Sequence, residues 1–210
     1  KALSDSRLEL QRGEIQYLET YKGYRTHLVV IQLGDNQASN TYVGIKRKRV
    51  EKASAKFNLN KLDEDTTTKE LLDIIKQLNE DPYVTGILVQ KPLPSHIDEY
   101  LVDCAIDPIK DVDGFNPVNI AKLHMNREDA MVPCTPLGII TLLEEYNIQL
   151  KGKNVIVMGR SNLVGNPVAK LLQQRDATVI QMHSKTDERR IDSIFMSTDI
   201  IISCMGNNEH

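Results

Sequence analysis

The sequence contains no tryptophan, and only 5% of its 210 residues are aromatic. Its three cysteines, Cys104, Cys134 and Cys204, are few and far apart. This spacing excludes a disulfide scaffold and favours a reducing compartment, for which we take the cytoplasm. Neither a CxxC nor an HxxxH spacing occurs, so we expect no metal site.

An excess of charge of one sign and a long apolar run are also missing. The net charge is −3 and the isoelectric point is near 6.0, which disfavours a nucleic-acid partner. No apolar run approaches the roughly 20 residues that span a bilayer, so we expect no membrane segment. Nothing near Lys1 resembles a signal peptide, although the chain begins without methionine and a leader could already have been removed.

Apolar patterns typical of helices and of strands alternate along the chain, and 40% hydrophobic residues suffice for a core. This alternation predicts an α/β fold with parallel sheet strands. Between about residues 104 and 136 the alternation lapses, so we place a boundary between two domains, 1–135 and 136–210. The predicted strands are 27–33, 84–90, 154–158, 177–182 and 199–204, and the predicted helices are 8–18, 39–55, 67–80, 137–146, 166–174 and 187–195.

Ser39, Tyr42 and Lys46 are spaced by three and then four residues, which places them on one face of a helix that follows a predicted strand. A hydroxyl, a phenol and an amine on one face can hold a flat polar molecule and move a proton. Helix residues just beyond the carboxyl end of a strand face the crevice where open α/β sheets bind ligands. The alternative is a solvated basic face, because Lys46 begins the run 46–49 of four basic residues.

Two further polar residues follow apolar segments. Gln90 ends a strand just before Pro92 and Pro94, which stiffen the following loop; it is either a strand end that meets water or an amide that binds a lysine or a ligand. Asp113 precedes Gly114, so it either supports a turn or accepts two adjacent N–H donors of a ligand ring.

A glycine-containing turn follows the predicted strand 154–158. Gly159, Arg160, Ser161 and Gly165 have the context of a phosphate-binding turn, although the spacing is not GxGxxG. The next strand ends near Ser184 with no acidic residue to hold the ribose hydroxyls of NAD. This segment is therefore either a site for the additional phosphate of NADP or an exposed polar turn without a ligand, and the sequence favours the two about equally.

Five motifs follow one another along the chain: SNTYVGIK at 39–46, GILVQKPLP at 86–94, KDVDGF at 110–115, PCTPLG at 133–138 and GRSNLVGNP at 159–167. In this order they resemble the bifunctional methylenetetrahydrofolate dehydrogenase/methenyltetrahydrofolate cyclohydrolase family. The resemblance implies an N-terminal α/β folate-binding catalytic domain and a C-terminal Rossmann-type NADP-binding domain. It also implies a homodimer that oxidises 5,10-methylenetetrahydrofolate with NADP and hydrolyses the methenyl product to 10-formyltetrahydrofolate.

The resemblance also implies a role for each matching residue. Lys46 is then the catalytic lysine, Tyr42 stacks on the folate, and Gln90 hydrogen-bonds Lys46. Ser39 and Asp113 bind the substrate. The residues that it implies for cofactor binding are Gly159, Arg160, Ser161, Gly165 and Ser184.

The chain departs from the family pattern at Lys91, where an apolar residue is usual, and at its ends, where we expect further family strands and therefore a truncated dinucleotide domain. Lys91 is interpreted either as a cation that acts on Lys46 or as a solvated side chain. A dehydrogenase-only relative and a non-catalytic folate-binding fragment stay open. A short-chain dehydrogenase, which also uses a Tyr-xxx-Lys pair, is disfavoured because here that pair precedes the nucleotide turn.

Overall fold

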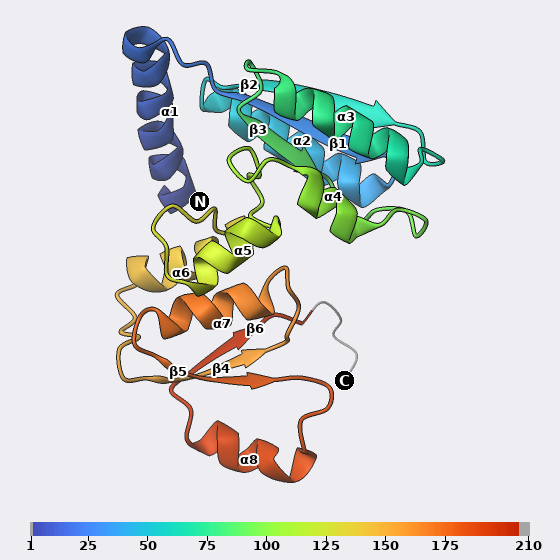
Figure 1. The fold of residues 1–210 in the computed structure, drawn as a ribbon. Helices are drawn as coiled ribbons and strands as arrows, with labels where there is room; N and C mark the ends of the chain where they lie inside the picture. Colours follow the sequence, from blue (N-terminus) through green and yellow to red (C-terminus); the bar gives the residue numbers. More distant parts are fainter. Residues whose placement is uncertain (1, 206–210) are drawn as a thin grey trace. The chain divides into compact units, whose positions relative to one another are not determined.

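The computed structural model describes residues 2–205, with only the backbone of Ala2 included. The chain divides after Val112 into two compact units, each with its own three-stranded sheet of parallel strands (Figure 1). The predicted two-domain α/β fold is confirmed. The division precedes the domain boundary that we predicted at residue 135.

The first sheet has the order β2-β1-β3, with β1 (His27–Leu33) between β2 (Lys56–Leu62) and β3 (Gly86–Val89). β1 is buried on both faces, which explains why residues 28–31 form a continuous apolar run rather than an alternating one. Val29 and Ile31 are at most 2% exposed on one face, and Val30 is 0% exposed on the other.

Four helices accompany this sheet: α1 (Ala2–Lys22), α2 (Gln37–Lys52), α3 (Thr68–Glu80) and α4 (Glu99–Ala105). Leu71 and Ile75 of α3 and Val102 of α4 pack in one cluster with Val29 and Ile31 of the sheet. α2 packs through Val43 against the opposite face, which holds Val30 and Leu88. The helix that carries part of the predicted site is thus fixed to the sheet by the side chain of Val43.

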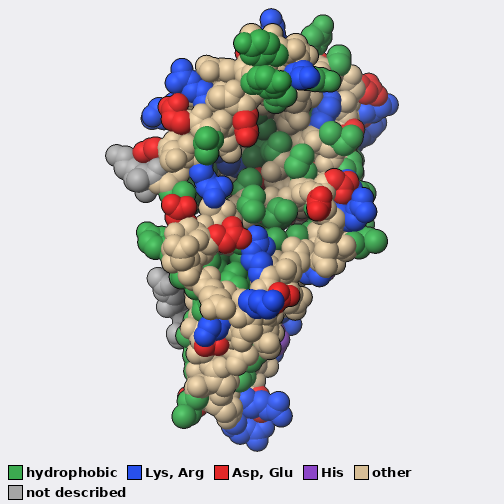
Figure 2. Space-filling model, turned by 90° about the vertical axis from the view of Figure 1, so that its left-hand side faces the viewer, with side chains coloured by type: hydrophobic (Ala, Val, Ile, Leu, Met, Phe, Trp, Pro, Cys, Tyr) green, Lys and Arg blue, Asp and Glu red, His purple; other side chains and the backbone are tan. Residues whose placement is uncertain are grey.

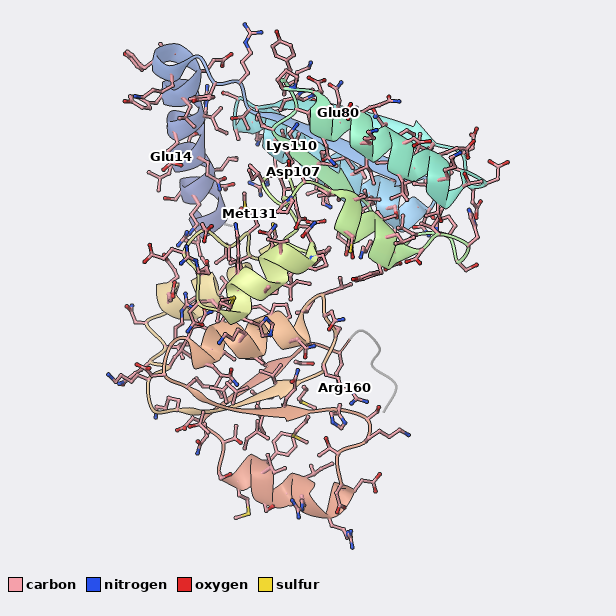
Figure 3. The ribbon with its side chains drawn as sticks, viewed as in Figure 1. Glu14, Glu80, Asp107, Lys110, Met131 and Arg160 are labelled. Atoms are coloured by element: carbon pink, nitrogen blue, oxygen red, sulfur yellow. The ribbon has the colours of Figure 1, made fainter. Side chains whose placement is uncertain are left out.

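A threonine followed three residues later by a glutamate predicts a capping box, and Thr67 and Glu70 form one at the start of α3. The hydroxyl of Thr67 accepts from the backbone N–H of Glu70, and the Glu70 carboxylate accepts from that of Thr67. Beyond the end of α3, Lys110 Nζ donates to the backbone carbonyls of Leu78, Asn79 and Asp81, at 2.8 to 3.0 Å (Figure 3). This lysine satisfies carbonyl groups at the helix end and binds the following segment to α3.

The second sheet has the order β5-β4-β6, formed by β4 (Asn154–Met158), β5 (Thr178–Met182) and β6 (Ile200–Ser203). The helices of this unit are α5 (Pro117–His124), α6 (Cys134–Glu145), α7 (Gly165–Gln173) and α8 (Glu188–Met196). Val168 and Leu172 of α7 and Ile140 of α6 pack with Val155 and Val157 of β4. α7 and α8 lie on opposite sides of the sheet (Figure 1).

The strand β2 and the helices α4 and α5 were not predicted from the sequence. β2 has the sequence KFNLNKL, whose polar residues belong to the exposed side of an edge strand. α4 and α5 have only 7 and 8 residues, too few for a clear helical period. Each begins with a side-chain cap, from Asp98 and Asn116, so local capping stabilises them.

Acidic and basic side chains are scattered over the face drawn in Figure 2, between hydrophobic and other surface. Among residues 2–205, no helix is long and apolar enough to cross a membrane.

Candidate active site

The side chains of Lys46 and Gln90 meet in the first unit. Lys46 Nζ donates to Gln90 Oε1 over 3.0 Å, although 44 residues separate the two along the chain. Lys46 is half-buried on α2, and Gln90 is 9% exposed directly after β3. The backbone N–H of Gln90 donates to the Ile31 carbonyl at 2.8 Å, so the sheet itself holds this residue. The interpretation of Gln90 as a strand end that merely meets water is therefore wrong.

The predicted face of α2 carries its three polar residues in different environments. Ser39 is 3% exposed and lies in the first turn, where its N–H donates to the capping oxygen of Asn36. Tyr42 is 61% exposed, so its ring is open to a planar ligand. Lys46 points toward Gln90 rather than into solvent with the rest of the basic run.

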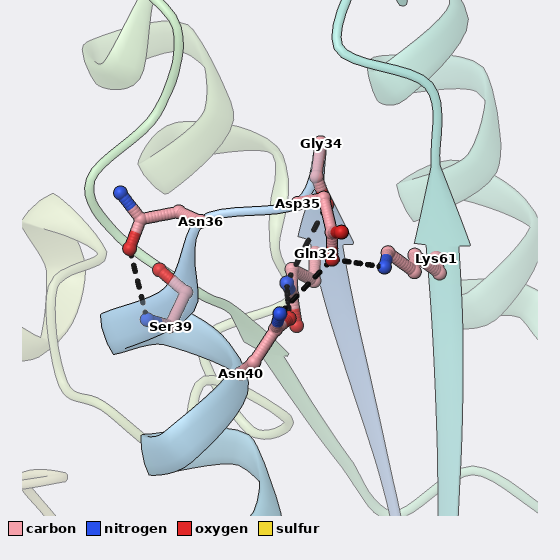
Figure 4. Close-up of polar contacts among 7 residues, drawn as sticks. All are labelled: Gln32, Gly34, Asp35, Asn36, Ser39, Asn40 and Lys61. Carbon is pink, nitrogen blue, oxygen red and sulfur yellow. Dashed lines mark hydrogen bonds and ion pairs between the residues drawn. The ribbon is translucent and has the colours of Figure 1, made fainter.

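A polar network that we did not predict fixes the turn between β1 and α2 (Figure 4). The buried amide of Gln32 donates to Asn40 Oδ1 at 2.6 Å, and the Asn40 amide donates to Asp35 at 2.9 Å. Asp35 also pairs with Lys61 of β2 at 2.6 Å. The hydrogen bond from Lys61 is the largest of the causes that lower the pKa of Asp35. A buried glutamine inside an apolar strand was the available sequence signal, because such an amide needs a partner.

Lys91 is largely buried and pairs with carboxylates of α4. Its side chain is 16% exposed, and Nζ lies 2.9 Å from Asp103 Oδ2 and 3.4 Å from Glu99 Oε2, both on α4. The pKa of Asp103 is raised, chiefly because burial disfavours its charged form; the nearby Lys91 ammonium acts in the opposite direction. The interpretation of Lys91 as a solvated side chain is therefore wrong.

Asp113 begins the second unit and lies with Val112 in a turn. The φ angle of the next residue, Gly114, is 70°, and a Cβ there would come within 2.5 Å of the Met131 carbonyl oxygen. Only glycine fits this position, so the predicted chain reversal is present. The part of Asp113 in substrate binding stays a prediction.

The nucleotide turn in the second unit connects β4 to α7. A Cβ at Gly165 would lie 2.5 Å from the Gly159 carbonyl oxygen, so the helix starts against the strand end without room for a side chain. Ser161 Oγ accepts from the backbone N–H groups of Val164 and Gly165, at 3.2 and 3.4 Å. Ser161 and Gly165 therefore shape this turn.

A pocket of about 590 Å³ opens beside this turn, between the ends of β4 and β5 and the helix α8. Arg160 extends from the end of β4 (Figure 3), and the exposed Ser184 follows β5. Glu188 adds an acidic group that we did not predict. The lining residues are Met158, Gly159, Arg160, Met182, His183, Ser184, Thr186, Glu188, Ile191 and Met205.

Within the described part of the chain, no group of three His, Cys, Asp or Glu residues is arranged to hold a metal ion. The candidate sites are thus an amine–amide pair in the first unit and a glycine-bounded pocket in the second.

Comparison with known proteins assigns both units. Residues 1–113 match the family model described as the catalytic domain of tetrahydrofolate dehydrogenase/cyclohydrolase, and residues 133–210 match its NAD(P)-binding domain. The chain belongs to the tetrahydrofolate dehydrogenase/cyclohydrolase family. The two models together cover most of the sequence and leave the segment that carries α5 between them.

Individual relatives agree with this family. The bifunctional protein FolD of Oceanobacillus iheyensis is 44% identical over 98% of this chain and 71% of its own length. The crystal structure of FolD from Campylobacter jejuni has 43% identity and a TM-score of 0.94, over 98% of this chain and 72% of that one. The Trypanosoma brucei FolD structure, a complex with NADP and an inhibitor, has 36% identity and a TM-score of 0.92, over 99% and 70%.

Membership confirms the predicted bifunctional enzyme, a methylenetetrahydrofolate dehydrogenase and methenyltetrahydrofolate cyclohydrolase with an NAD(P)-binding domain. The roles of the individual residues, the choice of NADP over NAD and the homodimer are finer statements, which we treat as proposals.

The raised pKa of Asp103 predicts a pH dependence of stability. The folded carboxyl keeps its proton to a higher pH than the unfolded one, so its contribution to stability is complete below about pH 4 and is lost as the pH rises through its folded pKa. Asp103→Asn replaces the titrating carboxyl by a neutral amide, so the variant does not lose this stability as the pH rises. We expect the thermal unfolding midpoint of the wild type, relative to that of Asp103→Asn, to fall as the pH rises across this window.

Asp73→Asn is the matched control for the change in net charge, because Asp73 is an exposed aspartate on α3 of the same unit. A constant difference between wild type and Asp103→Asn from pH 3 to pH 7 would contradict the raised pKa.

Proposed function

We propose that Lys46 and Gln90 form the catalytic centre for hydrolysis of 5,10-methenyltetrahydrofolate, the product that the same protein makes by oxidising 5,10-methylenetetrahydrofolate with NADP. The hydrogen bond of 3.0 Å between the amine and the amide supports this proposal most directly. It holds a proton-carrying group in one place, and general acid–base catalysis needs such a fixed group.

The oxidation needs little from the side chains beyond orientation. The bound cofactor supplies the hydride acceptor, and the protein has to hold the one-carbon bridge against it at about 3–3.5 Å without water between them. Tyr42 contributes an exposed ring on which a folate ring can stack. Asp113 and Ser39 supply an acceptor and a hydroxyl for polar groups of the substrate. These three residues would therefore orient the substrate and take no part in making or breaking its covalent bonds.

The hydrolysis needs proton transfer. Water adds to the positively charged methenyl carbon, one carbon–nitrogen bond breaks, and one proton is released overall as 10-formyltetrahydrofolate forms. Lys46 moves protons between the attacking water and the nitrogen that leaves, while Gln90 keeps the amine oriented by accepting one of its N–H groups.

The pocket of the second unit fits a dinucleotide. The close approach of Gly165 to the Gly159 carbonyl leaves open the place that a side chain would fill, as phosphate-binding turns require. Arg160 and Ser184 supply a cation and a hydroxyl for the additional phosphate of NADP. Glu188 on the same wall supports the alternative, NAD, because a carboxylate holds ribose hydroxyls.

We further propose that the protein works as a homodimer in the cytoplasm. No disulfide links Cys104, Cys134 or Cys204 in the described chain, which is compatible with a reducing compartment.

Replacing Lys46 tests the catalytic centre. Lys46→Ala removes the amine, so we expect the cyclohydrolase kcat to fall on the order of 10²- to 10⁴-fold, the usual contribution of a general acid or base. The dehydrogenase kcat is expected to change far less. Absorbance of the reduced cofactor and of the methenyl intermediate, followed together, measures both steps.

Lys48→Ala is the control, because Lys48 is an exposed lysine of the same helix. If Lys46→Ala hydrolyses the methenyl compound at the wild-type rate, Lys46 has no part in the mechanism. A wild-type protein that accumulates the methenyl intermediate would instead be a dehydrogenase only.

Replacing Asp113 tests substrate binding. Asp113→Asn keeps the shape but removes the charge, so binding of tetrahydrofolate should weaken about tenfold to a hundredfold, the loss of a hydrogen bond to a charged group. Calorimetric titration measures this affinity. Glu128→Gln, at an exposed carboxylate of the same unit, is the control. Equal affinities of wild type and Asp113→Asn would exclude Asp113 from the binding site.

Replacing Arg160 tests the choice of cofactor. Arg160→Ala is expected to raise the Kd for NADP about tenfold to a hundredfold and to leave the Kd for NAD nearly unchanged, because only NADP carries the phosphate that the guanidinium binds. Arg190→Ala, at an exposed arginine of α8, is the control. Equal losses for both cofactors would contradict phosphate recognition by Arg160.

A further inference from the structure

The side-chain amide of Gln90 is held at both of its ends. Its Oε1 accepts from Lys46 Nζ at 3.0 Å, and its Nε2 donates to the backbone carbonyl of Lys91 at 2.6 Å. A carboxamide has a donor end and an acceptor end of nearly equal size, so its partners decide which end points where. The Lys91 carbonyl thereby directs the oxygen of Gln90 toward the amine of Lys46.

The side chain of Lys91 is fixed in turn by two carboxylates of α4. Glu99 and Asp103 lie four residues apart, hence on one face of this helix, and both are within 3.4 Å of Lys91 Nζ. The same helix is anchored in the core of the first unit by Val102, which is 0% exposed. Lys91 is therefore tied to the hydrophobic core through these two ion pairs.

We propose that Lys91 is a positioning residue for the hydrolysis, which fixes the orientation of the Gln90 amide through its own backbone carbonyl while Glu99 and Asp103 hold its side chain. This inference rests on the proposed function of Lys46 and Gln90. It assigns a role to the ion-pair cluster that Lys91 forms with Glu99 and Asp103.

Of the two ion pairs, the one between Lys91 and Asp103 is the less exposed. The side chains of Lys91 and Asp103 are 16% and 19% exposed, so water screens their attraction less than at the surface. These ion pairs engage the Lys91 ammonium with α4, while the oxygen of Gln90 accepts from Lys46.

Loss of the ion pair should loosen the segment that carries the Lys91 carbonyl. The Gln90 amide can then rotate by half a turn and present its N–H₂ group to Lys46, where two donors meet and no hydrogen bond forms. A misplacement of about 1 Å at a catalytic group lowers the rate up to about a hundredfold. The dehydrogenase step, which needs no proton from Lys46, is insensitive to this rotation.

Substitution of Lys91 tests the proposal. We expect Lys91→Met, which removes the charge and keeps an unbranched side chain, to lower the cyclohydrolase kcat on the order of ten- to a hundredfold, with little change in KM and in the dehydrogenase kcat. Lys91→Arg, which can still bind both carboxylates, should restore most of the activity. Lys69→Met, at an exposed lysine of α3, is the control for the change in charge.

A spectroscopic measurement follows the amide directly. The side-chain N–H₂ signal of Gln90 in a ¹⁵N–¹H spectrum, assigned by its absence in Gln90→Met, should shift in Lys91→Met and return in Lys91→Arg. Asp103→Asn gives a second variant, which keeps Lys91 and weakens its attachment. We expect a smaller shift of the same signal and a smaller loss of hydrolysis.

The possible outcomes separate the two proposals. If Lys46→Ala keeps its cyclohydrolase activity, the proposed function fails, and the Gln90 signal still shows whether Lys91 orients the amide. If Lys46→Ala is inactive but Lys91→Met has the wild-type rate and an unshifted Gln90 signal, the positioning role is overturned. A parallel loss of both activities without rescue by Lys91→Arg would also overturn it.

Discussion

The hydrogen bond from Lys46 Nζ to Gln90 Oε1 joins a helix on one face of the first sheet to the residue that follows its strand β3. A bond between a charged donor and an amide contributes about 1.5–3 kcal/mol, more than an ordinary hydrogen bond. Its value for chemistry lies in geometry, because it fixes a flexible lysine in one orientation. Two further sets of polar contacts bear on this pair: the Gln32 network fixes the turn before α2, and the Lys91 carbonyl accepts from the Gln90 amide.

The parallel sheet is what brings the two residues together. In a parallel sheet all strands end at the same edge, so the residues that follow β1 and β3 become neighbours. The turn after β1 is fixed by the network of Gln32, Asn40 and Asp35, and α2 is packed by Val43. The position of Lys46 is therefore set by polar contacts at the start of its helix and by apolar contacts along it.

Much of the fold follows from local sequence. β1 and β4 were predicted with the bounds that the structure shows, because each is an apolar run that ends at a polar turn. The capping box of α3 was predicted from Thr67 and Glu70 alone. β2 was missed because an edge strand is half polar, and its pairing with β1 comes from the neighbouring strand rather than from its own composition.

The sequence by itself determined the family, through five ordered motifs, and the shared helix of Ser39, Tyr42 and Lys46, through residue spacing. Only the tertiary structure decided which partners these side chains have. The Lys46–Gln90 and Lys91–Asp103 contacts join segments 44 and 12 residues apart. Spacing along a helix is a local property, whereas such contacts depend on how strands pair and helices pack. For Lys91 the sequence therefore left open a choice that α4, by supplying two carboxylates, resolves.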